Sequence, residues 1–478
     1  MSDNHHADDK IISVHHPSEN HDSRGLVNQH EEDTIEASLE GHEVNQIKDS
    51  PRTITGAEDP YFTEGLKNPG WLSTGALFLT TFSIFGITFC WGVFQPHYLN
   101  HVYPGQTDIF RIAFIGTSTQ AITTLLGLPL TFVIRCIGYK GTMMIGVILL
   151  PLGLILASFA TQLWQTALAH GVLVGIGAAF CFSSSFMLPS QWFVRRRATV
   201  NGIGNAGACV GALCLSPLAE HLIETLGYRN ALRVLGSIVF ALLSLATLIA
   251  RARYPPSPSS NTTTTTTPSS IMQKKRRKIA FFRSSPLFSA PFAFALVFSL
   301  LTPFGYVAPF YLMPTYVMQV VGSSASMGAA FVSVGMATGV VSRLGSGFIG
   351  DRIGPINALF LATLMSAILI MALWPFSHSL PVCGIFSAAM GLTAGTYFGL
   401  IPSVLARIAG MEHLYVSGAV AWMFISIGSL LGTPCVGKMQ KDLGWPYAIQ
   451  FAGAAELIAA LCMLAIKLLL DRRLCSKI

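Results

Sequence analysis

One arginine of this 478-residue chain stands deep inside an apolar run, where a charge needs a chemical reason. Arg343 lies eight residues before Asp351, about 12 Å along a helix that rises 1.5 Å per residue. An arginine at the centre of a membrane helix costs roughly 2.5–3.5 kcal/mol on insertion scales. A buried guanidinium can bind a carboxylate through two parallel hydrogen bonds. We therefore expect Arg343 to contact a substrate carboxylate; an internal ion pair or a helix-end anchor is the alternative.

Glu456 and two tyrosines are the other side chains with chemical potential inside apolar runs. Glu456 lies about nine residues into the last run, and a buried carboxyl can carry a proton because burial disfavours its charged form. We expect a proton-coupling role, with a hydrogen-bonded packing role as the alternative. Three prolines at 302–314 must bend their helix, and broken helices that line a cavity are typical of transporters. Tyr306 and Tyr311 are expected to line such a substrate cavity; a packing kink is the alternative.

A charged turn follows Arg343. Gly347, Asp351, Arg352 and Gly354 end one apolar run, and the next begins at Ile356. A weaker copy at 131–138 carries Arg135 in the place of Asp351 and Gly138 in the place of Gly354. We expect the turn to act as a gate, and its copy indicates a chain that is built twice.

The composition of the chain indicates whether water or lipid surrounds the elements that carry these residues. The chain is 51% hydrophobic and 11% charged, whereas soluble domains carry about a quarter charged residues. Twelve apolar runs are each long enough to cross a bilayer core of about 30 Å, and only helices satisfy their own backbone at that length. We predict an all-α integral membrane protein with twelve spans in two six-helix pseudo-repeats. The spans are 71–98, 112–134, 142–164, 166–188, 198–223, 231–250, 291–317, 327–349, 356–376, 380–401, 416–436 and 447–469.

Composition also predicts the domain organisation. Residues 1–68 are polar and acidic, with 5 Lys/Arg against 15 Asp/Glu, so we expect a disordered cytosolic tail. Residues 69–250 and 286–470 are expected to form two six-helix bundles. A Pro/Ser/Thr-rich, basic segment at 251–285 reads as a cytosolic linker, and 471–478 as a cytosolic C-terminal tail.

The distribution of basic residues predicts the orientation. If the N-terminus is cytosolic, the cytosolic side holds 20 Lys/Arg of the membrane body and the far side holds 5. We therefore expect both termini in the cytosol, in a multi-pass protein of the plasma membrane. The basic excess lies in short loops between apolar runs, so nucleic acid is not an expected partner. The lipid bilayer and a small-molecule substrate are, and protons are an open alternative.

Several motif matches fail in their context, and we expect neither an enzyme nor a cofactor or metal site. Residues 202–207 fit G-x-G-x-x-G without following a strand, and Gly207-x-x-x-Gly211 predicts close helix packing instead. Residues 432–438 nearly spell a P-loop, but Met439 stands where Mg²⁺ needs a hydroxyl. The nine cysteines show no ligand spacing and are interpreted as packing residues.

Twelve helices, a long central loop and the Gly347–Gly354 turn resemble the major facilitator superfamily. Further stretches resemble the fungal branch of its monocarboxylate porter family: residues 92–95, 115–120, 171–177, and 191–198 with the glycines that follow. The resemblance implies alternating access around a midplane cavity, and it implies that Arg343 holds a substrate carboxylate. This chain has Gly339 where animal relatives carry an aspartate, and its first helix lacks their lysine. Proton–lactate symport is therefore not implied.

We predict a secondary active transporter of small organic anions, monocarboxylate-like, or of related small metabolites. One alternative is an efflux pump that exports a fungal secondary metabolite. A second alternative is a nutrient sensor that keeps the transporter scaffold but does not transport.

Overall fold

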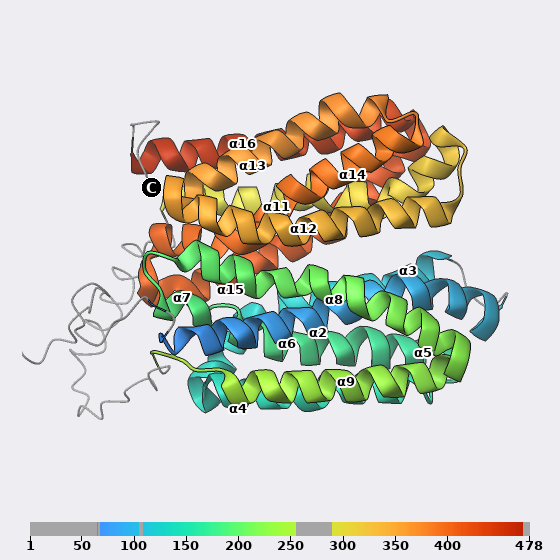
Figure 1. The fold of residues 1–478 in the computed structure, drawn as a ribbon, viewed down its shortest axis with the longest axis horizontal. Coiled ribbons are helices and arrows are strands. Elements are labelled where there is room, and N and C mark those ends of the chain that lie inside the picture. Colours follow the sequence, from blue (N-terminus) through green and yellow to red (C-terminus); the bar gives the residue numbers. More distant parts are fainter. Residues whose placement is uncertain (1–64, 66, 105–108, 255–288, 472–478) are drawn as a thin grey trace, which may run out of the picture. The chain divides into compact units, whose positions relative to one another are not determined.

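A computed structural model of the chain describes residues 65, 67–104, 109–254 and 289–471, all within one compact unit, Tyr61–Ile478. Every regular element in these ranges is a helix (Figure 1), so the predicted all-α fold is confirmed. The linker beyond Tyr254, the C-terminal tail beyond Asp471 and nearly all of the N-terminal tail lie outside the described residues.

The helices fall into two sets on either side of the linker. The first set is α2 (Gly70–His97), α3 (Ile109–Leu125), α4 (Gly127–Ala157), α5 (Leu163–Thr166), α6 (Val174–Ser185), α7 (Leu188–Trp192), α8 (Arg197–Leu226) and α9 (Tyr228–Ile249). The second set is α11 (Ala290–Tyr316), α12 (Ala325–Ile353), α13 (Pro355–Ile368), α14 (Leu380–Ala394), α15 (Thr396–Leu443) and α16 (Trp445–Leu470). Short π-helical segments extend some of them, at Tyr98–Val102, Ala167–Leu173, Val317–Val321 and Leu369–Leu373.

The number of membrane crossings depends on two glycines inside long helices. Eleven helices of the described residues are long and apolar enough to span a bilayer. The predicted span at 112–134 is not one of these eleven helices. The structure divides it between α3, which is only 17 residues long, and the first part of α4. Gly138 (φ 76°) then divides α4, and Gly410 (φ 75°) divides α15. Counting α3 with the start of α4 as one crossing gives the twelve that were predicted.

Four glycine turns support the pseudo-repeat. Gly138 and Gly354, which were aligned by sequence, both have positive φ (76° and 97°), a conformation that costs glycine little. Gly227 and Gly444 form a second such pair, at φ 78° and 92°. The intervals 227 − 138 = 89 and 444 − 354 = 90 residues are nearly equal. The two halves therefore repeat the same turns at the same spacing.

Close helix packing within the first set follows the glycines of α8. A Cβ atom at Gly207 would overlap the carbonyl oxygen of Phe78 in α2, and one at Gly211 would overlap that of Phe82. The backbones of α2 and α8 therefore meet at these glycines, as the sequence pattern predicted.

The two sets meet along α8 and α12, which lie side by side (Figure 1). We call the end where α8 begins and α12 ends the linker face, because both borders of the linker lie there, and the opposite end the far face. A Cβ atom at Gly347 of α12 would come within 2.7 Å of the Ala198 carbonyl oxygen. At Gly202 of α8, a Cβ atom would overlap the carbonyl oxygen of Arg343. The sets are therefore in tight contact near the linker face.

Candidate functional site

Arg343 lies buried between the two helix sets. Its side chain is 3% exposed, and Nη1 donates a hydrogen bond to the Cys209 sulfur of α8. Its guanidinium carbon stands 5.1 Å from the ring centre of Phe398 in α15. Nε is buried without a hydrogen-bond partner, and no carboxylate of the described residues forms an ion pair with this arginine. The alternative of an internal ion pair is therefore not seen in the described part of the chain.

The two tyrosines of α11 continue the site away from Arg343. Tyr306 lies close enough to Arg343, Cys209 and Tyr311 to interact electrostatically with all three. Its ring also contacts Phe398, with centroids 5.4 Å apart. Tyr311, five residues further along α11, is 51% exposed. The structure thus brings three of the predicted residues, Arg343, Tyr306 and Tyr311, into one group.

Aromatic rings surround this polar group. Phe398 stacks on Trp422 at 5.7 Å and meets Phe85 of α2 edge-on at 6.4 Å. Trp422 in turn contacts Phe182 of α6 and Phe186, which directly follows α6, both with centroids 5.0 Å away. Helices of both sets contribute to this aromatic cluster. It places a set of buried aromatic rings next to the buried guanidinium of Arg343.

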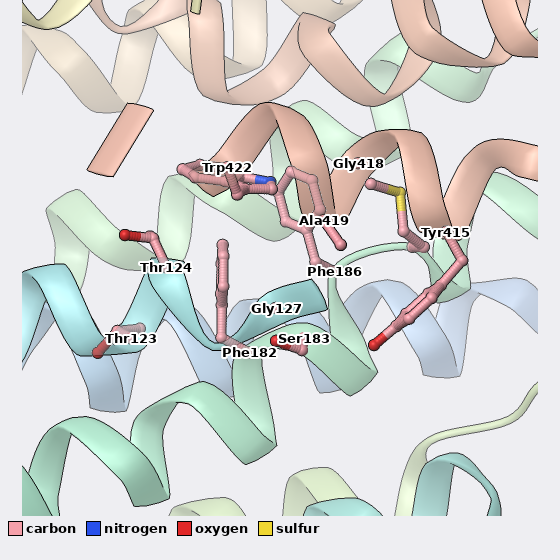
Figure 2. A pocket seen from close by; sticks show the side chains of 11 residues that line it. Thr123, Thr124, Gly127, Phe182, Ser183, Phe186, Tyr415, Gly418, Ala419 and Trp422 are labelled. Atoms are coloured by element: carbon pink, nitrogen blue, oxygen red, sulfur yellow. The ribbon is translucent and has the colours of Figure 1, made fainter. Parts of the chain in front are cut away.

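A small cavity lies between α3, α4 and α6 on one side and α15 on the other. Figure 2 shows Trp422 and Phe186 close together on one side of it, with the Tyr415 phenol and the threonines Thr123 and Thr124 around it. Its volume is about 20 Å³, enough for roughly one water molecule, whereas ligand pockets measure about 300–1,000 Å³. This cavity cannot hold an organic acid unless the two helix sets separate.

Glu456 lies in a different place from Arg343. Its side chain on α16 is 2% exposed and packs against Gly305 of α11, where a Cβ atom would come within 2.6 Å of it. Ser366 of α13 is within hydrogen-bonding range, while Oε2 has no partner. Glu456 therefore packs against α11 at Gly305, the residue before Tyr306, and its side chain lies among α11, α13 and α16. Among the described residues, no interaction joins it to Arg343.

The turn residues form a connection across the two sets. Both carboxylate oxygens of Asp351 accept hydrogen bonds from the N-terminus of α8: Oδ1 from the Ala198 N–H at 2.9 Å, and Oδ2 from the Thr199 N–H at 2.9 Å and hydroxyl at 2.6 Å. A carboxylate is favourable there because the N-terminal N–H groups carry partial positive charge. Arg352 instead stacks on Phe348 of its own helix at 4.1 Å. Gly347 allows the close approach of α12 to Ala198 of α8, and Gly354 forms the positive-φ turn described above.

Two members of the group were missed in the sequence. Cys209 was interpreted as a packing residue, and Phe398 was not singled out. The glycine spacing of α8 showed that it packs closely, but an all-apolar helix does not reveal which residue faces which neighbour. In the described residues, three or more His, Cys, Asp or Glu side chains nowhere gather as a metal site would require.

Comparisons with known proteins agree with this architecture. The family description Major Facilitator Superfamily matches residues 76–433. Monocarboxylate transporter 13 of Rattus norvegicus is 26% identical over 392 residues, which cover 82% of this chain and 87% of the relative. The aspyridones efflux protein apdF of Emericella nidulans is 26% identical over 391 residues, covering 80% and 74%.

A solved structure shows the same fold. The E. coli fucose:proton symporter FucP superposes with a TM-score of 0.59 at 14% identity, covering 82% of this chain and 98% of that protein. The family match spans well over half of the sequence and agrees with the helix count and the repeated turns. The chain therefore belongs to the major facilitator superfamily and is a multi-pass membrane transporter rather than an enzyme.

Proposed function

We propose that this transporter carries organic acids, with Arg343 as the group that binds the carboxylate. The observation that supports this is a buried guanidinium with an unpartnered Nε and no carboxylate partner among the described residues. A buried charge is costly unless an opposite charge and good hydrogen bonds compensate it. A substrate carboxylate would supply both, and the planar guanidinium suits it.

The aromatic cluster favours a substrate with an apolar body. Phe398 and Tyr306 lie within 5.4 Å of one another, beside Arg343, and Trp422 stacks on Phe398. Aromatic faces bind apolar and planar groups well. A monocarboxylate with an aromatic or branched body fits this site better than lactate does. Tyr311 is proposed to complete the site as its exposed hydrogen-bonding member.

Transport would follow alternating access between the two helix sets. In this structure the linker face is closed by the hydrogen bonds between Asp351 and the N-terminus of α8. Opening this face requires that these bonds break and that α12 leaves α8. We propose Gly347, Asp351, Arg352 and Gly354 as the gating turn. The carboxyl of Glu456, buried against Gly305 of α11, is the proposed proton carrier.

Export of a secondary metabolite is the second candidate function. The similarity to the aspyridones efflux protein favours it, since the coverage of both chains is high. Uptake and export share the same site and differ in orientation and driving gradient. We further propose that the linker and both termini face the cytosol and that the protein resides in the plasma membrane, in keeping with its basic residues.

Flux in reconstituted vesicles tests the proposed function. Purified protein in liposomes is expected to exchange radiolabelled benzoate faster than lactate, because the cluster binds an apolar body. Empty liposomes correct for passive leak of the neutral acid. A non-transporting sensor would show no flux above these liposomes for any acid. Faster lactate than benzoate exchange would contradict the aromatic-body specificity.

A further inference from the structure

A second group of titratable side chains lies on the far face, away from Arg343. A cavity of about 270 Å³ is bordered there by the end of α2, the α4–α5 loop and the start of α9. We call it the far-face hollow. Its lining is His97, His101, Val102, Ala160, Thr161, Tyr228 and Arg229. None of these residues is acidic, and two histidines and an arginine share one opening.

The histidines form a close pair. The imidazoles of His97 and His101 stack with centroids 4.8 Å apart and planes 21° apart. The His97 ring also contacts the ring of Tyr228 across the hollow, at 5.5 Å. When the two rings are protonated they repel each other at this distance, unless an anion lies between or beside them. The pair is therefore a structure that an anion stabilises at low pH.

Arg229 and the start of α9 add fixed positive charge. Arg229 donates from Nε to the Tyr228 hydroxyl at 3.0 Å, and its side chain is fully exposed. Its two Nη groups form no hydrogen bond within the described residues. Helix α9 begins right here, after Gly227, with no side-chain cap and no acidic residue in its first turn. The N–H groups of its first residues thus lack partners within the helix and favour a negative charge nearby.

The charge around the pair selects the kind of ligand. Two titratable groups contact His97, namely His101 on its own segment and Tyr228 at the start of α9. Tyr228 in turn lies near Tyr103 and Arg229. The α4–α5 loop contributes no titratable side chain to the lining. Two histidines four residues apart can also bind a transition metal, but a neighbouring arginine opposes a cation, and no carboxylate is among the described residues that line the hollow.

We propose that the far-face hollow binds a carboxylate anion, held by Arg229 and the start of α9 and strengthened by protonation of His97 and His101. This site is separate from Arg343 and does not depend on the proposed function. Burial and the neighbouring His101 lower the pKa of His97. By linkage, protonation and anion binding strengthen each other. Affinity should therefore rise as the pH falls through the range of histidine titration.

The test measures how sodium acetate shifts the thermal unfolding temperature of the full-length protein in detergent, at pH 5.5 and at pH 7.5. Acetate is mostly ionised at both pH values. The Arg343→Ala background removes the central candidate site, and sodium chloride keeps the ionic strength constant. Because the imidazole of His97 carries a proton in a larger share of molecules at pH 5.5 than at pH 7.5, the half-saturating acetate concentration should be several-fold lower at pH 5.5.

Variants assign the effect to the hollow. The double change His97→Gln with His101→Gln should abolish the pH dependence, and Arg229→Gln should raise the half-saturating concentration at both pH values. Arg229→Lys keeps the charge if the glutamine variant folds poorly. His221→Gln, an exposed α8 histidine outside the lining, is the matched control and should behave as the parent. Equal acetate stabilisation in all variants, or none in the parent, would overturn the proposal. Stabilisation by zinc chloride instead of acetate, lost with the two histidines, would also overturn it.

Discussion

Neutralising Asp351 should open the linker face. Its carboxylate accepts three hydrogen bonds from Ala198 and Thr199. Asp351→Asn keeps one amide oxygen as an acceptor but places an NH₂ group against donors at the other position. Hydrogen bonds to charged groups contribute about 1.5–3 kcal/mol each. Because Asp351 is half-buried and solvent screens it, we expect a loss of about 2 kcal/mol, which increases the open population about 30-fold.

Alkylation of a native cysteine measures this population. Cys209 is 2% exposed between α8 and α12, so a maleimide can reach it only when the two sets separate. The rate at which Cys209 is alkylated, followed by mass spectrometry of peptides, should rise about 30-fold in Asp351→Asn if opening and closing are fast relative to alkylation. Cys181 is fully buried inside the first set and serves as an internal reference. An unchanged Cys209 rate would refute the latch. An equal rise at Cys181 would also refute it, since that pattern reports unfolding.

Three further predictions concern other parts of the molecule. Glu456→Gln should flatten the pH dependence of flux, measured in liposomes between about pH 5 and 8, because it removes the proposed proton carrier; an unchanged profile contradicts that role. Gly202→Ala should raise the alkylation rate of Cys209 while the protein stays folded, because the new Cβ atom overlaps α12 only when the linker face is closed. Gly207→Ala should instead lower the thermal stability, because there the new Cβ atom overlaps α2 within one helix set. In anion-free buffer, thermal stability should fall as the pH drops below about 6.5, the ordinary pKa of histidine. The pKa of His97 is lowered in the folded protein, so folding favours the neutral imidazole, and the stability that this contributes above pH 6.5 is lost as the ring is protonated. His97→Gln should remove part of that fall.

The sequence predicted the helices and several close contacts because their causes are local or repeated. Apolar runs of bilayer length must be helical. Gly207 and Gly211, one turn apart, predicted that their helix packs closely against another, and the structure shows that this neighbour is α2. The correspondence of Gly138 with Gly354 predicted a chain that is built twice, and the structure gives both glycines a positive φ. These inferences needed only spacing and backbone chemistry.

The surroundings of Arg343 could not be predicted in the same way. A membrane helix is apolar on most sides, so hydrophobic periodicity does not tell which side faces a neighbour. The contacts of Arg343 with Cys209 and Phe398 come from helices that are 134 and 55 residues away in the chain. The far-face hollow likewise combines three segments that only the tertiary fold brings together. The second crossing was predicted as one run, although Gly127 and Pro129 stand directly after the break between α3 and α4.

The central claim is that Arg343 binds the carboxylate of the substrate. Its most direct test is the flux of radiolabelled benzoate into liposomes that contain Arg343→Ala, compared with the parent and with Gly345→Ala. Gly345 lies on the same helix with open space around its Cβ position, so its alanine variant is a matched control. We predict that Arg343→Ala and Arg343→Lys insert normally and lose benzoate flux, while Gly345→Ala keeps it. Normal benzoate flux through correctly inserted Arg343→Ala would contradict the claim.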